Sequence, residues 1–560
     1  MVVIPKLGKA EVKDGKIDLR TLKSVFICAE FGGILPVVNR TLFEKIGLHL
    51  QSGGADDIPG MRIFFDGHLN PEGYEMKISE SGIDIKAGGK NGALYACQTL
   101  RAALKADAKT RGYTKDFGGN PDASANPKAD AKTRIYTADF CEISDAPAYS
   151  YRGLLIDVAR YFYDAEYIKR ILDLMLLHKM NTLHLHLTDD QGWRIEIKKY
   201  PLLSEIGSKR EKTHIGGWKN KNDLDDGKPH SGFYTQKEMK EIVAYAAEIG
   251  IQIIPEIDMP AHFAAAFAAY PHLACRDKKV SVPWYFGGHY PSVHGERDWN
   301  RSACIGKEAT FRFIFDVIDE IFDIFPAPYF HIGGDEAPKD EWKNCPDCQR
   351  LMKSENIGSV EELQRYFMRK INAYVKSKGK NLIAWNEALE GGNFDTEMIA
   401  QYWTPKKDPN VREFLKKGGR VLVSKHNPMY FDMPFSQYPL KNIYKFKPSE
   451  PIGEEYADRI AGVEAAVWTE WLGSREKLEF RLLPRLSAAA EVCWTGGGGE
   501  DYAEFSARIK EFGEIYEGLG FNYARAKTAD PKNPVKRILT MRDFFFKDPD
   551  REFKENEKLK

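Results

Sequence analysis

The sequence predicts an α/β protein built on a (β/α)8 TIM barrel that is preceded by a small α+β domain. After residue 148, eight apolar segments typical of buried parallel strands alternate with amphipathic helical segments. The first 145 residues show a different pattern, in which half-exposed strands precede a helix. An open doubly wound sheet is the rival fold, but no G-x-G-x-x-G motif follows the first apolar segment. We therefore expect domains at residues 1–147, 148–500 and 501–560.

The N-terminal domain is predicted from two segments, 74–78 and 82–86, in which apolar and polar residues alternate. This alternation is typical of half-buried strands, and a turn joins the two. A helical segment follows at 93–104. These elements indicate a separate α+β unit ahead of the barrel.

A near-perfect internal repeat follows that helix. The heptapeptide KADAKTR occurs at 105–111 and again at 128–134, and Tyr-Thr-x-Asp-Phe follows each copy. Two copies are too few for a repeat architecture, which needs at least three. We interpret residues 105–139 as a duplicated surface loop without a catalytic role.

The barrel is predicted from short apolar runs separated by helices with recognisable ends. Asp164 is placed to cap a helix whose apolar residues recur at helical spacing. Thr235-x-x-Glu238 and Ser359-x-x-Glu362 have the spacing of capping boxes. The predicted strands span 153–158, 182–187, 251–257, 329–332, 381–384, 398–402, 420–423 and 462–467.

The C-terminal end, 501–560, is predicted to be a helix and a charged tail that packs on the barrel. Residues 502–517 have the pattern of a closing helix. The charged segment 542–560 is expected to lie loosely over the surface or to fray.

Composition argues against several classes of partner. Lys and Arg together number 81, as do Asp and Glu, so no net charge favours nucleic acid or an anionic membrane. No apolar stretch approaches the ~20 residues that span a bilayer. The first residues lack the apolar core of a secretory signal. We expect a cytoplasmic protein, or a secreted one whose signal peptide has been removed.

Cysteines and histidines give little sign of a metal. Only Cys345-Pro-Asp-Cys348 has a meaningful spacing, and no second CxxC completes a four-thiolate zinc site. A local disulfide or two reduced thiols is therefore favoured over a metal. His184 and His186 share one face of a predicted strand, which favours packed histidines over a metal pair. We expect no metal and no cofactor.

Polar and aromatic residues gather where the predicted strands end. In a barrel of this kind the chemistry collects at the C-terminal ends of the strands, so these side chains are expected on one rim. Arg152, at the start of the first strand, lies at the opposite end and is predicted to be structural. The rim residues are Arg160, Asp189, Asp190, Asp258, His262, Asp335, Glu336, Trp385, Asn386, Glu387, Trp403, Tyr430, Asp432, Trp468 and Glu470.

The mixture of tryptophans and carboxylates on this rim suits a sugar, which has apolar ring faces and hydroxyl donors. Glycoside hydrolysis needs an acid to protonate the leaving oxygen and a group that stabilises the oxocarbenium-like centre. Asp335 and Glu336 are neighbours and are poorly placed to flank one bond as a retaining pair. One of them can be the acid, while the other orients another group of the substrate.

Six ordered motifs resemble those of the family 20 glycoside hydrolases, the β-N-acetylhexosaminidases. The resemblance covers residues 150–495, and the first 145 residues resemble the small domain that precedes the barrel in that family. The motifs are RGLLIDVAR (152–160), HLHLTDDQGWR (184–194), PEIDMPAH (255–262), HIGGDE (331–336), QYW (401–403) and GVEAAVWTE (462–470).

The resemblance implies substrate-assisted catalysis, in which the 2-acetamido oxygen of the substrate attacks the anomeric carbon. Glu336 is expected to be the general acid and then the base that activates water. Asp335 is expected to hold the acetamido N–H, and Tyr430 to hydrogen-bond the attacking oxygen.

The resemblance also assigns the substrate pocket. Asp189, Asp258 and His262 match a network that tunes the acids; Asp189 and His262 are also expected to bind the substrate, with scaffolding that does not touch the sugar as the alternative. An aromatic platform is expected at Tyr444 or Phe446. Walls around the acetamido group and the ring are expected from Trp385, Trp403 and Trp468, and a closed end that implies exo action from Arg160, Asp432 and Glu470.

The main hypothesis is an exo-acting, retaining β-N-acetylhexosaminidase whose partner is an oligosaccharide or glycoconjugate. A lacto-N-biosidase, which releases a disaccharide, is an alternative within the class. A non-catalytic carbohydrate-binding protein is an alternative outside it, although Asp335, Glu336 and Tyr430 argue against this. The preference for GlcNAc or GalNAc stays open, and a homodimer is possible.

Overall fold

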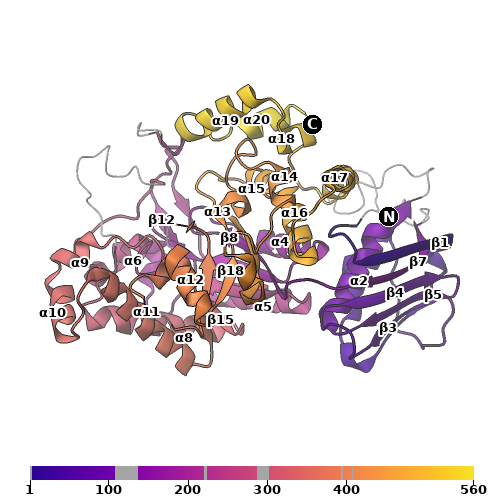
Figure 1. Ribbon diagram of the computed structural model, residues 1–560, viewed down its shortest axis with the longest axis horizontal. Coiled ribbons are helices and arrows are strands. Elements are labelled where there is room, and N and C mark those ends of the chain that lie inside the picture. The colour runs from indigo at the N-terminus through magenta and orange to yellow at the C-terminus, as the bar shows by residue number, and fades with distance from the viewer. Residues whose placement is uncertain are drawn as a thin grey trace.

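The computed structural model describes residues 3–106, 136–219, 224–286, 302–392, 395–405 and 408–559. The chain forms a sheet domain, a closed barrel and a group of C-terminal helices (Figure 1). The N-terminal sheet lies at one side of the barrel, and the C-terminal helices lie across one end of it.

The N-terminal domain is a seven-stranded mixed sheet with the order β1-β7-β4-β5-β3-β2, and β6 pairs with β7. The predicted hairpin is confirmed, because β4 and β5 pair antiparallel. The strands are β1 (Lys9–Asp18), β2 (Val25–Ile27), β3 (Gly60–Phe65), β4 (Tyr74–Ser79), β5 (Gly82–Ala87), β6 (Lys105–Ala106) and β7 (Tyr136–Asp145).

Helix α2 (Lys90–Ala103) joins this sheet to the barrel and confirms the predicted helix. It packs on β4 and β5 and also contacts the first barrel helix, α4 (Ala165–Leu177). Nearly all of its residues are buried, because it has a neighbour on both sides.

The duplicated segment is not wholly a surface loop. Residues 136–139 form the start of β7, where Thr137 pairs with Asp18 and Ala138 with Ile17 of β1. The expectation for these residues was wrong because Tyr136 and Ala138 are buried in the core of the sheet. The remainder, 107–135, lies outside the described residues.

The second domain is a closed parallel barrel with the order β14-β15-β16-β17-β18-β19-β8-β9. All eight predicted barrel strands are confirmed. They are β8 (Tyr151–Asp157), β9 (Thr182–His186), β14 (Gln252–Glu256), β15 (Tyr329–His331), β16 (Asn381–Trp385), β17 (Ile399–Tyr402), β18 (Arg420–Val423) and β19 (Ile460–Val467).

Helices surround this barrel, and short strands occur in the loops that follow β9 (Figure 1). The helices are α4, α5 (Gln236–Glu248), α6 (Ala264–Ala269), α8 (Glu308–Ile324), α9 (Asp340–Asn344), α10 (Pro346–Ser354), α11 (Val360–Ser377), α12 (Asp408–Lys416), α13 (His426–Met429), α14 (Leu440–Tyr444), α15 (Arg475–Leu482) and α16 (Arg485–Thr495). The loop strands are β10 (Thr188–Asp189), β11 (Gly192–Trp193), β12 (Lys209–Arg210) and β13 (His230–Ser231).

The predicted helix starts are all confirmed, but one of the two predicted capping boxes is incomplete. Asp164 caps α4, and Thr235 with Glu238 forms a full capping box on α5. Ser359 accepts from the backbone N–H of Glu362 on α11, as predicted. The Glu362 carboxylate does not complete the capping box at Ser359. It accepts instead from the backbone N–H of Gly358, the residue before Ser359, at 2.7 Å.

Arg152 joins the two domains at the end of the barrel away from the strand C-termini, which confirms its structural role. Its Nη1 and Nη2 each donate to the Glu72 carboxylate at 2.8 Å. Its Nε donates to the Lys179 carbonyl at 2.8 Å. A bidentate ion pair of this kind, between buried Arg152 and partly buried Glu72, holds a specific geometry.

The C-terminal helices are α17 (Tyr502–Gly518), α18 (Ala526–Ala529), α19 (Pro534–Phe546) and α20 (Arg551–Glu557). The closing helix is confirmed as α17, and the tail packs on the barrel as predicted, but it is helical and partly buried and does not drape loosely or fray. Glu552 is buried, accepts from the backbone N–H of Phe435 at 2.8 Å and pairs with Arg481 at 2.7 Å. These buried charges hold the last helix against the barrel loops.

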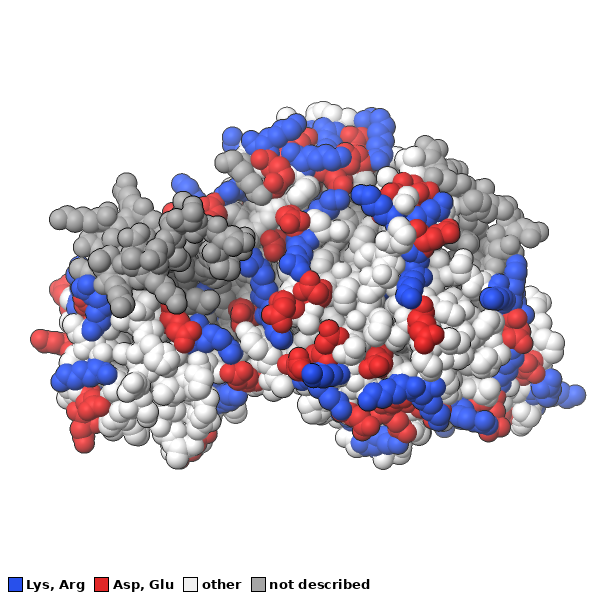
Figure 2. Space-filling model, turned by 180° about the vertical axis from the view of Figure 1, so that it is seen from behind, with Lys and Arg blue, Asp and Glu red and all other residues white. Residues whose placement is uncertain are grey.

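Charges of both signs are mixed over the face in Figure 2. Within the described ranges, every helix is too short or too polar to cross a bilayer.

Candidate active site

The two adjacent acids lie directly after β15, where the backbone turns sharply. Gly333 and Gly334 have φ of +73° and +93°. A Cβ on Gly333 would lie 1.7 Å from Oδ1 of Asp258, so only glycine fits there. Glu336 itself has φ of +47°, a costly conformation for a residue with a side chain. The turn leaves the Glu336 side chain 55% exposed, whereas that of Asp335 is 15% exposed.

His262 lies between these acids and a third carboxylate. Its Nδ1 is 3.3 Å from Oδ1 of Asp189, and its Nε2 is 3.7 Å from Oδ2 of Asp335 and 3.7 Å from Oε2 of Glu336. Burial lowers the pKa of His262, but Asp189 and Glu336 together hold that pKa well above its ordinary value. The imidazole is therefore a cation beside both acids.

Burial raises the pKa values of two neighbouring carboxyl groups, those of Asp335 and Asp258. It raises the pKa of Asp335 to about 8, the nearby acids Glu387 and Glu336 add to the shift, and His262 opposes it. Burial and Asp335 raise the pKa of Asp258 well above its ordinary value. Asp258 also accepts from the backbone N–H of Gly334 at 3.3 Å. The Asp258–Asp335 pair therefore keeps a proton that a solvated pair would lose, and with this proton on Asp258 the Asp335 carboxyl can be ionised.

Aromatic side chains from four strand ends form a wall. The rings of Trp403 and Tyr430 are parallel within 12° at 6.0 Å, and Trp468 lies 6.0 Å from Tyr430 and 5.9 Å from Trp385. Trp403 Nε1 donates to Glu387 at 2.7 Å, which fixes that ring. Burial and Asp335 raise the pKa of Tyr430 well above its ordinary value, so its hydroxyl stays a donor.

Arg160, Asp432 and Glu470 surround one end of this wall. Nη2 of Arg160 lies 2.6 Å from Asp189 and 4.0 Å from Glu470, and its guanidinium is 5.2 Å from the centre of the Trp468 ring. Burial raises the pKa of Asp432 to about 8, and Glu470 adds to the shift. The structure thus brings Arg160 together with the acids Asp189, Asp432 and Glu470, where the substrate pocket is expected.

The segment that carries Asp432 is held from behind. Arg485 of α16 donates to the carbonyls of Phe431 at 2.6 Å and Met433 at 2.7 Å, on either side of Asp432. Phe544 of α19 packs against Met433, which lies next to Asp432 in the sequence. The C-terminal helices therefore help to position this end of the pocket.

Three buried carboxylate oxygens of the pocket have no hydrogen-bond partner among the described protein groups. They are Oδ1 of Asp335, Oδ1 of Asp432 and Oε2 of Glu470. An unsatisfied buried acceptor costs about 1–3 kcal/mol, so each such atom needs an explanation. A ligand with several N–H and O–H donors would satisfy all three.

Sequence reasoning missed the charged centre of the barrel. Glu256 of β14 accepts from Trp385 Nε1 at 2.9 Å and lies 2.9 Å from Nδ1 of His331. Glu464 of β19 lies 2.9 Å from Nδ1 of His184 and accepts from Gln401 at 2.6 Å. The only sequence signal was an acid within an apolar strand, a position that is almost never buried unless it is paired.

Asp157 was missed in the same way. Its Oδ1 accepts from the backbone N–H groups of Ala159 and Arg160 at 2.8 and 3.1 Å. Its Oδ2 accepts from the backbone N–H and the hydroxyl of Thr469, both at 3.0 Å. Asp157 therefore ties the end of β8 to the end of β19, next to Arg160 and Glu470.

The histidines at the centre have donor geometry but are already engaged. One nitrogen or oxygen each of His184, Glu256 and His331 lies within 4.8 Å of the others, as metal ligands would. Within the group, Glu256 lies 2.9 Å from Nδ1 of His331 and 3.2 Å from Nε2 of His184, and it also accepts from Trp385 Nε1, so contacts between protein groups account for the cluster. His184 and His186 do share one face of β9, and both are packed, as predicted.

The predicted aromatic platform was wrong. Tyr444 and Phe446 are 4% and 7% exposed and belong to the main core. The Tyr444 ring stacks on Phe505 of α17 at 4.5 Å, and its hydroxyl donates to the Asp501 carbonyl. Packing of α14 against the C-terminal helices takes up the surface that a substrate platform would need.

Comparison with family models follows the two-domain division. Residues 149–497 match the model described as glycosyl hydrolase family 20, catalytic domain. Residues 1–115 match the model described as glycosyl hydrolase family 20, domain 2.

Two curated relatives are β-hexosaminidases. That of Porphyromonas gingivalis is 36% identical over 469 residues, which are 81% of this chain and 55% of the relative, so the chain spans about half of that protein. That of Akkermansia muciniphila is 30% identical over 511 residues, which are 89% of this chain and 93% of the relative.

Two solved structures are similar over almost the whole chain. The exo β-N-acetylglucosaminidase of Vibrio harveyi, solved with N-acetylglucosamine, has a TM-score of 0.78 at 28% identity and covers 93% of this chain and 78% of its own. The β-N-acetylhexosaminidase of Bacteroides fragilis has a TM-score of 0.77 at 27% identity and covers 95% of this chain and 99% of its own.

Proposed function

The chain belongs to glycosyl hydrolase family 20, and from this premise we propose that it is an exo-acting, retaining β-N-acetylhexosaminidase. It removes terminal β-linked GlcNAc or GalNAc from the non-reducing end of oligosaccharides or glycoconjugates. The observation that carries this proposal is the set of three unpaired carboxylate oxygens on Asp335, Asp432 and Glu470 beside a tryptophan wall. An N-acetylhexosamine has an amide N–H, several hydroxyls and apolar ring faces to match them.

In the first step, the acetamido oxygen of the bound sugar attacks the anomeric carbon and the glycosidic C–O bond breaks. Glu336 gives its proton to the leaving oxygen, and an oxazolinium ion forms on the sugar. The exposed Glu336 side chain supports this role, because the leaving group must extend toward solvent. The nucleophile belongs to the substrate, so no second flanking carboxylate is needed.

Asp335 and Tyr430 orient the acetamido group during that attack. The amide N–H donates to Asp335, whose ionised form then stabilises the positive charge that develops on nitrogen. The Tyr430 hydroxyl, kept protonated by burial, donates to the attacking oxygen. In the second step, water attacks the anomeric carbon, Glu336 takes its proton, and the ring opens with retained configuration.

Arg160, Asp432 and Glu470 bind the sugar hydroxyls at the closed end, so only a terminal residue fits. Asp189, Asp258 and His262 act behind the acids, and the short contacts of Asp189 with Arg160 and His262 favour support over direct sugar binding. The reaction uses side chains and the substrate alone, without a cofactor. Choice between GlcNAc and GalNAc rests on the 4-hydroxyl, which Arg160 and Glu470 are placed to contact.

The assignment is tested with aryl β-glycosides of GlcNAc, GalNAc and glucose and with one defined tetrasaccharide. We expect turnover of the two acetamido sugars, none of the glucoside, release of a monosaccharide, and inhibition by a thiazoline mimic of the oxazolinium ion. Release of a disaccharide would identify a lacto-N-biosidase instead. Binding of GlcNAc without turnover of any substrate would identify a binding protein.

Assembly and location stay predictions. A homodimer is measured by sedimentation of the full chain, and a cytoplasmic or secreted location by fractionation of the producing cell.

A further inference from the structure

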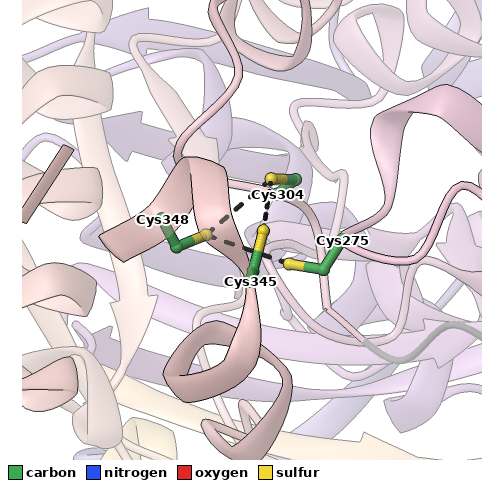
Figure 3. Close-up of side chains that lie close together, drawn as sticks. All are labelled: Cys275, Cys304, Cys345 and Cys348. Carbon is green, nitrogen blue, oxygen red and sulfur yellow. Dashed lines mark hydrogen bonds between the residues drawn. The ribbon is translucent and has the colours of Figure 1, made fainter. Parts of the chain in front are cut away.

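Four cysteines from three separate segments meet outside the active site (Figure 3). Cys275 follows α6, Cys304 precedes α8, and Cys345 and Cys348 lie at the start of α10. Their sulfur atoms all lie within 4.8 Å of one another and point toward a common centre. All four are free thiols, and three of them are 3% exposed or less.

The distances between the sulfur atoms fit a tetrahedral metal site. They are 3.5 Å for Cys304 and Cys345, 3.7 Å for Cys304 and Cys348, and 3.9 Å for Cys275 and Cys348. Zinc binds thiolate sulfur at about 2.3 Å, so the sulfur atoms of a four-thiolate zinc tetrahedron lie about 3.8 Å apart. Bonded sulfur atoms of a disulfide lie only about 2.05 Å apart.

The backbone around the cluster is arranged to hold it. A Cβ on Gly306 would lie 2.3 Å from the backbone nitrogen of Cys348, so only glycine allows this approach. The backbone N–H of Gly306 hydrogen-bonds the Cys348 sulfur. Such N–H donors to sulfur are the contacts that orient and stabilise metal thiolates. Lys307 donates to the carbonyls of His272 and Ala274, which orders the chain before Cys275.

We propose that Cys275, Cys304, Cys345 and Cys348 bind one Zn²⁺ in a closed structural site. The four thiols give up their protons to solvent as the metal binds. Four protein ligands leave no open position, so the ion supports the fold and takes no part in hydrolysis. The sequence expectation of a disulfide or two thiols considered only Cys345 and Cys348. The other two ligands are 29 residues apart in the chain, so no second CxxC announces them.

The site would fasten the loop after β14 to the loop after β15, which carries Asp335 and Glu336. Hydrogen bonds already join the same two loops: Ser302 Oγ donates to the Pro338 carbonyl at 2.8 Å, and Trp342 Nε1 to the Ala303 carbonyl at 3.0 Å. His262 belongs to the first loop and both acids to the second. The ion therefore holds in register the two segments that bring His262 to the acids.

The direct test is elemental analysis of the full chain, purified without chelator, together with its intact mass under non-reducing conditions. We expect about one zinc per chain, bound in exchange for four thiol protons, and its release when a mercurial reagent titrates the thiols. The matched variants are Cys348→Ser in the cluster and Cys97→Ser, a buried thiol of α2 outside it. Cys97→Ser keeps the zinc, whereas Cys348→Ser loses most of it and melts at a lower temperature.

Because Cys348→Ser could fail to fold, the metal content and intact mass of the unaltered chain decide whether the site binds zinc. A chain with four free thiols and no metal after growth in zinc-supplemented medium would overturn the proposal. So would the mass of two disulfides, or an iron ion in place of zinc. None of these results touches the proposed glycosidase activity, which is assayed separately.

Discussion

Nδ1 of His262 lies 3.3 Å from Oδ1 of Asp189, and this pairing turns Nε2 toward both Asp335 and Glu336 at 3.7 Å. Asp189 is also bound to Arg160, at 2.6 Å. The Asp189 carboxylate thus links His262, which lies beside the two acids, with Arg160, which is proposed to bind the sugar hydroxyls. A change in either group is therefore expected to reach the other.

Replacement of Glu336 by Gln removes the proton that the leaving oxygen needs. We expect kcat/KM for an N-acetylated oligosaccharide to fall by about 10²–10⁴-fold, the usual worth of a positioned acid. The loss should be smaller for an aryl glycoside, whose leaving group needs less protonation. Glu361→Gln, an exposed acid on α11, is the control. A Glu336→Gln enzyme that keeps most of its activity on the oligosaccharide would contradict the assignment of Glu336 as the general acid.

Replacement of His262 by Phe removes a cation that lowers the pKa of Asp335. The pKa of Asp335 should then rise. Because Asp335 acts as a carboxylate, activity is lost as the pH falls through that pKa, so the acidic limb of kcat/KM should move to higher pH. The control is His272→Phe, an exposed histidine further along the same loop. An unchanged acidic limb in His262→Phe would contradict the proposed electrostatic role.

Replacement of Asp432 by Asn tests the closed end of the pocket. Above its pKa of about 8, Asp432 is ionised, and a hydrogen bond to a charged group contributes about 1.5–3 kcal/mol, so kcat/KM measured at that pH should fall by about 10–100-fold. Substrates that each lack one hydroxyl identify the hydroxyl that Asp432 binds. Removing that hydroxyl should lower kcat/KM of the original enzyme much more than kcat/KM of Asp432→Asn. If no deoxy substrate separates the two enzymes, Asp432 does not contact the sugar.

His178 makes stability depend on pH. Burial lowers its pKa to about 4 from 6.5 in the unfolded chain, while its Nε2 hydrogen-bonds Ser487 and Tyr516. Between these values only the unfolded chain takes up the proton, so this contribution is complete above pH 6.5 and is lost as the pH falls toward about 4. The loss amounts to about 3 kcal/mol.

The measurement is urea unfolding of the chain and of His178→Gln at several pH values. The variant is less stable at neutral pH, but its stability should fall less steeply between pH 6.5 and about 4. His68→Gln, at an exposed site, should keep the original slope. Equal slopes for His178→Gln and the original chain would exclude His178 as the group responsible.

Replacement of Arg152 by Met leaves Glu72 without its bidentate partner at the domain boundary. Removing one member of a buried ion pair costs about 3–5 kcal/mol, so the free energy of unfolding should fall by that amount. Arg312→Met, which breaks the exposed pair with Glu308, should change it by less than about 1 kcal/mol. Similar losses in the two variants would mean that the Arg152 contact adds nothing beyond a surface pair.

Much of the site could be predicted because residues that follow the barrel strands in the sequence meet at one end of the barrel. A strand of the barrel is recognisable from a short apolar run, and closure then brings eight strand ends to one rim. Asp335, Trp403 and Glu470 could therefore be named together, although 135 residues separate the first from the last. Glu256, Glu464 and Asp157 escaped notice because an acid inside an apolar strand does not reveal the partners that make its burial possible.

Contacts between distant segments account for the errors. Tyr444 was predicted to face the substrate, but the packing of α14 against α17 buries it against Phe505. Segment 542–560 was expected to fray because it is highly charged, yet Arg481 neutralises Glu552 in a buried contact. In both cases the deciding partner is another element of the tertiary fold, which local pattern cannot identify.

The sequence by itself determined the barrel, its eight strands and the residue types at its rim, because strand and helix periodicity are local properties of the chain. Only the tertiary structure decided that His262 faces both acids, that three carboxylate oxygens lack partners among the described residues, and that Cys275 and Cys304 join Cys345 and Cys348. The physical reason is that hydrogen bonds and metal coordination act over a few ångströms. Which side chains come that close depends on loops whose paths are set by packing against the whole fold.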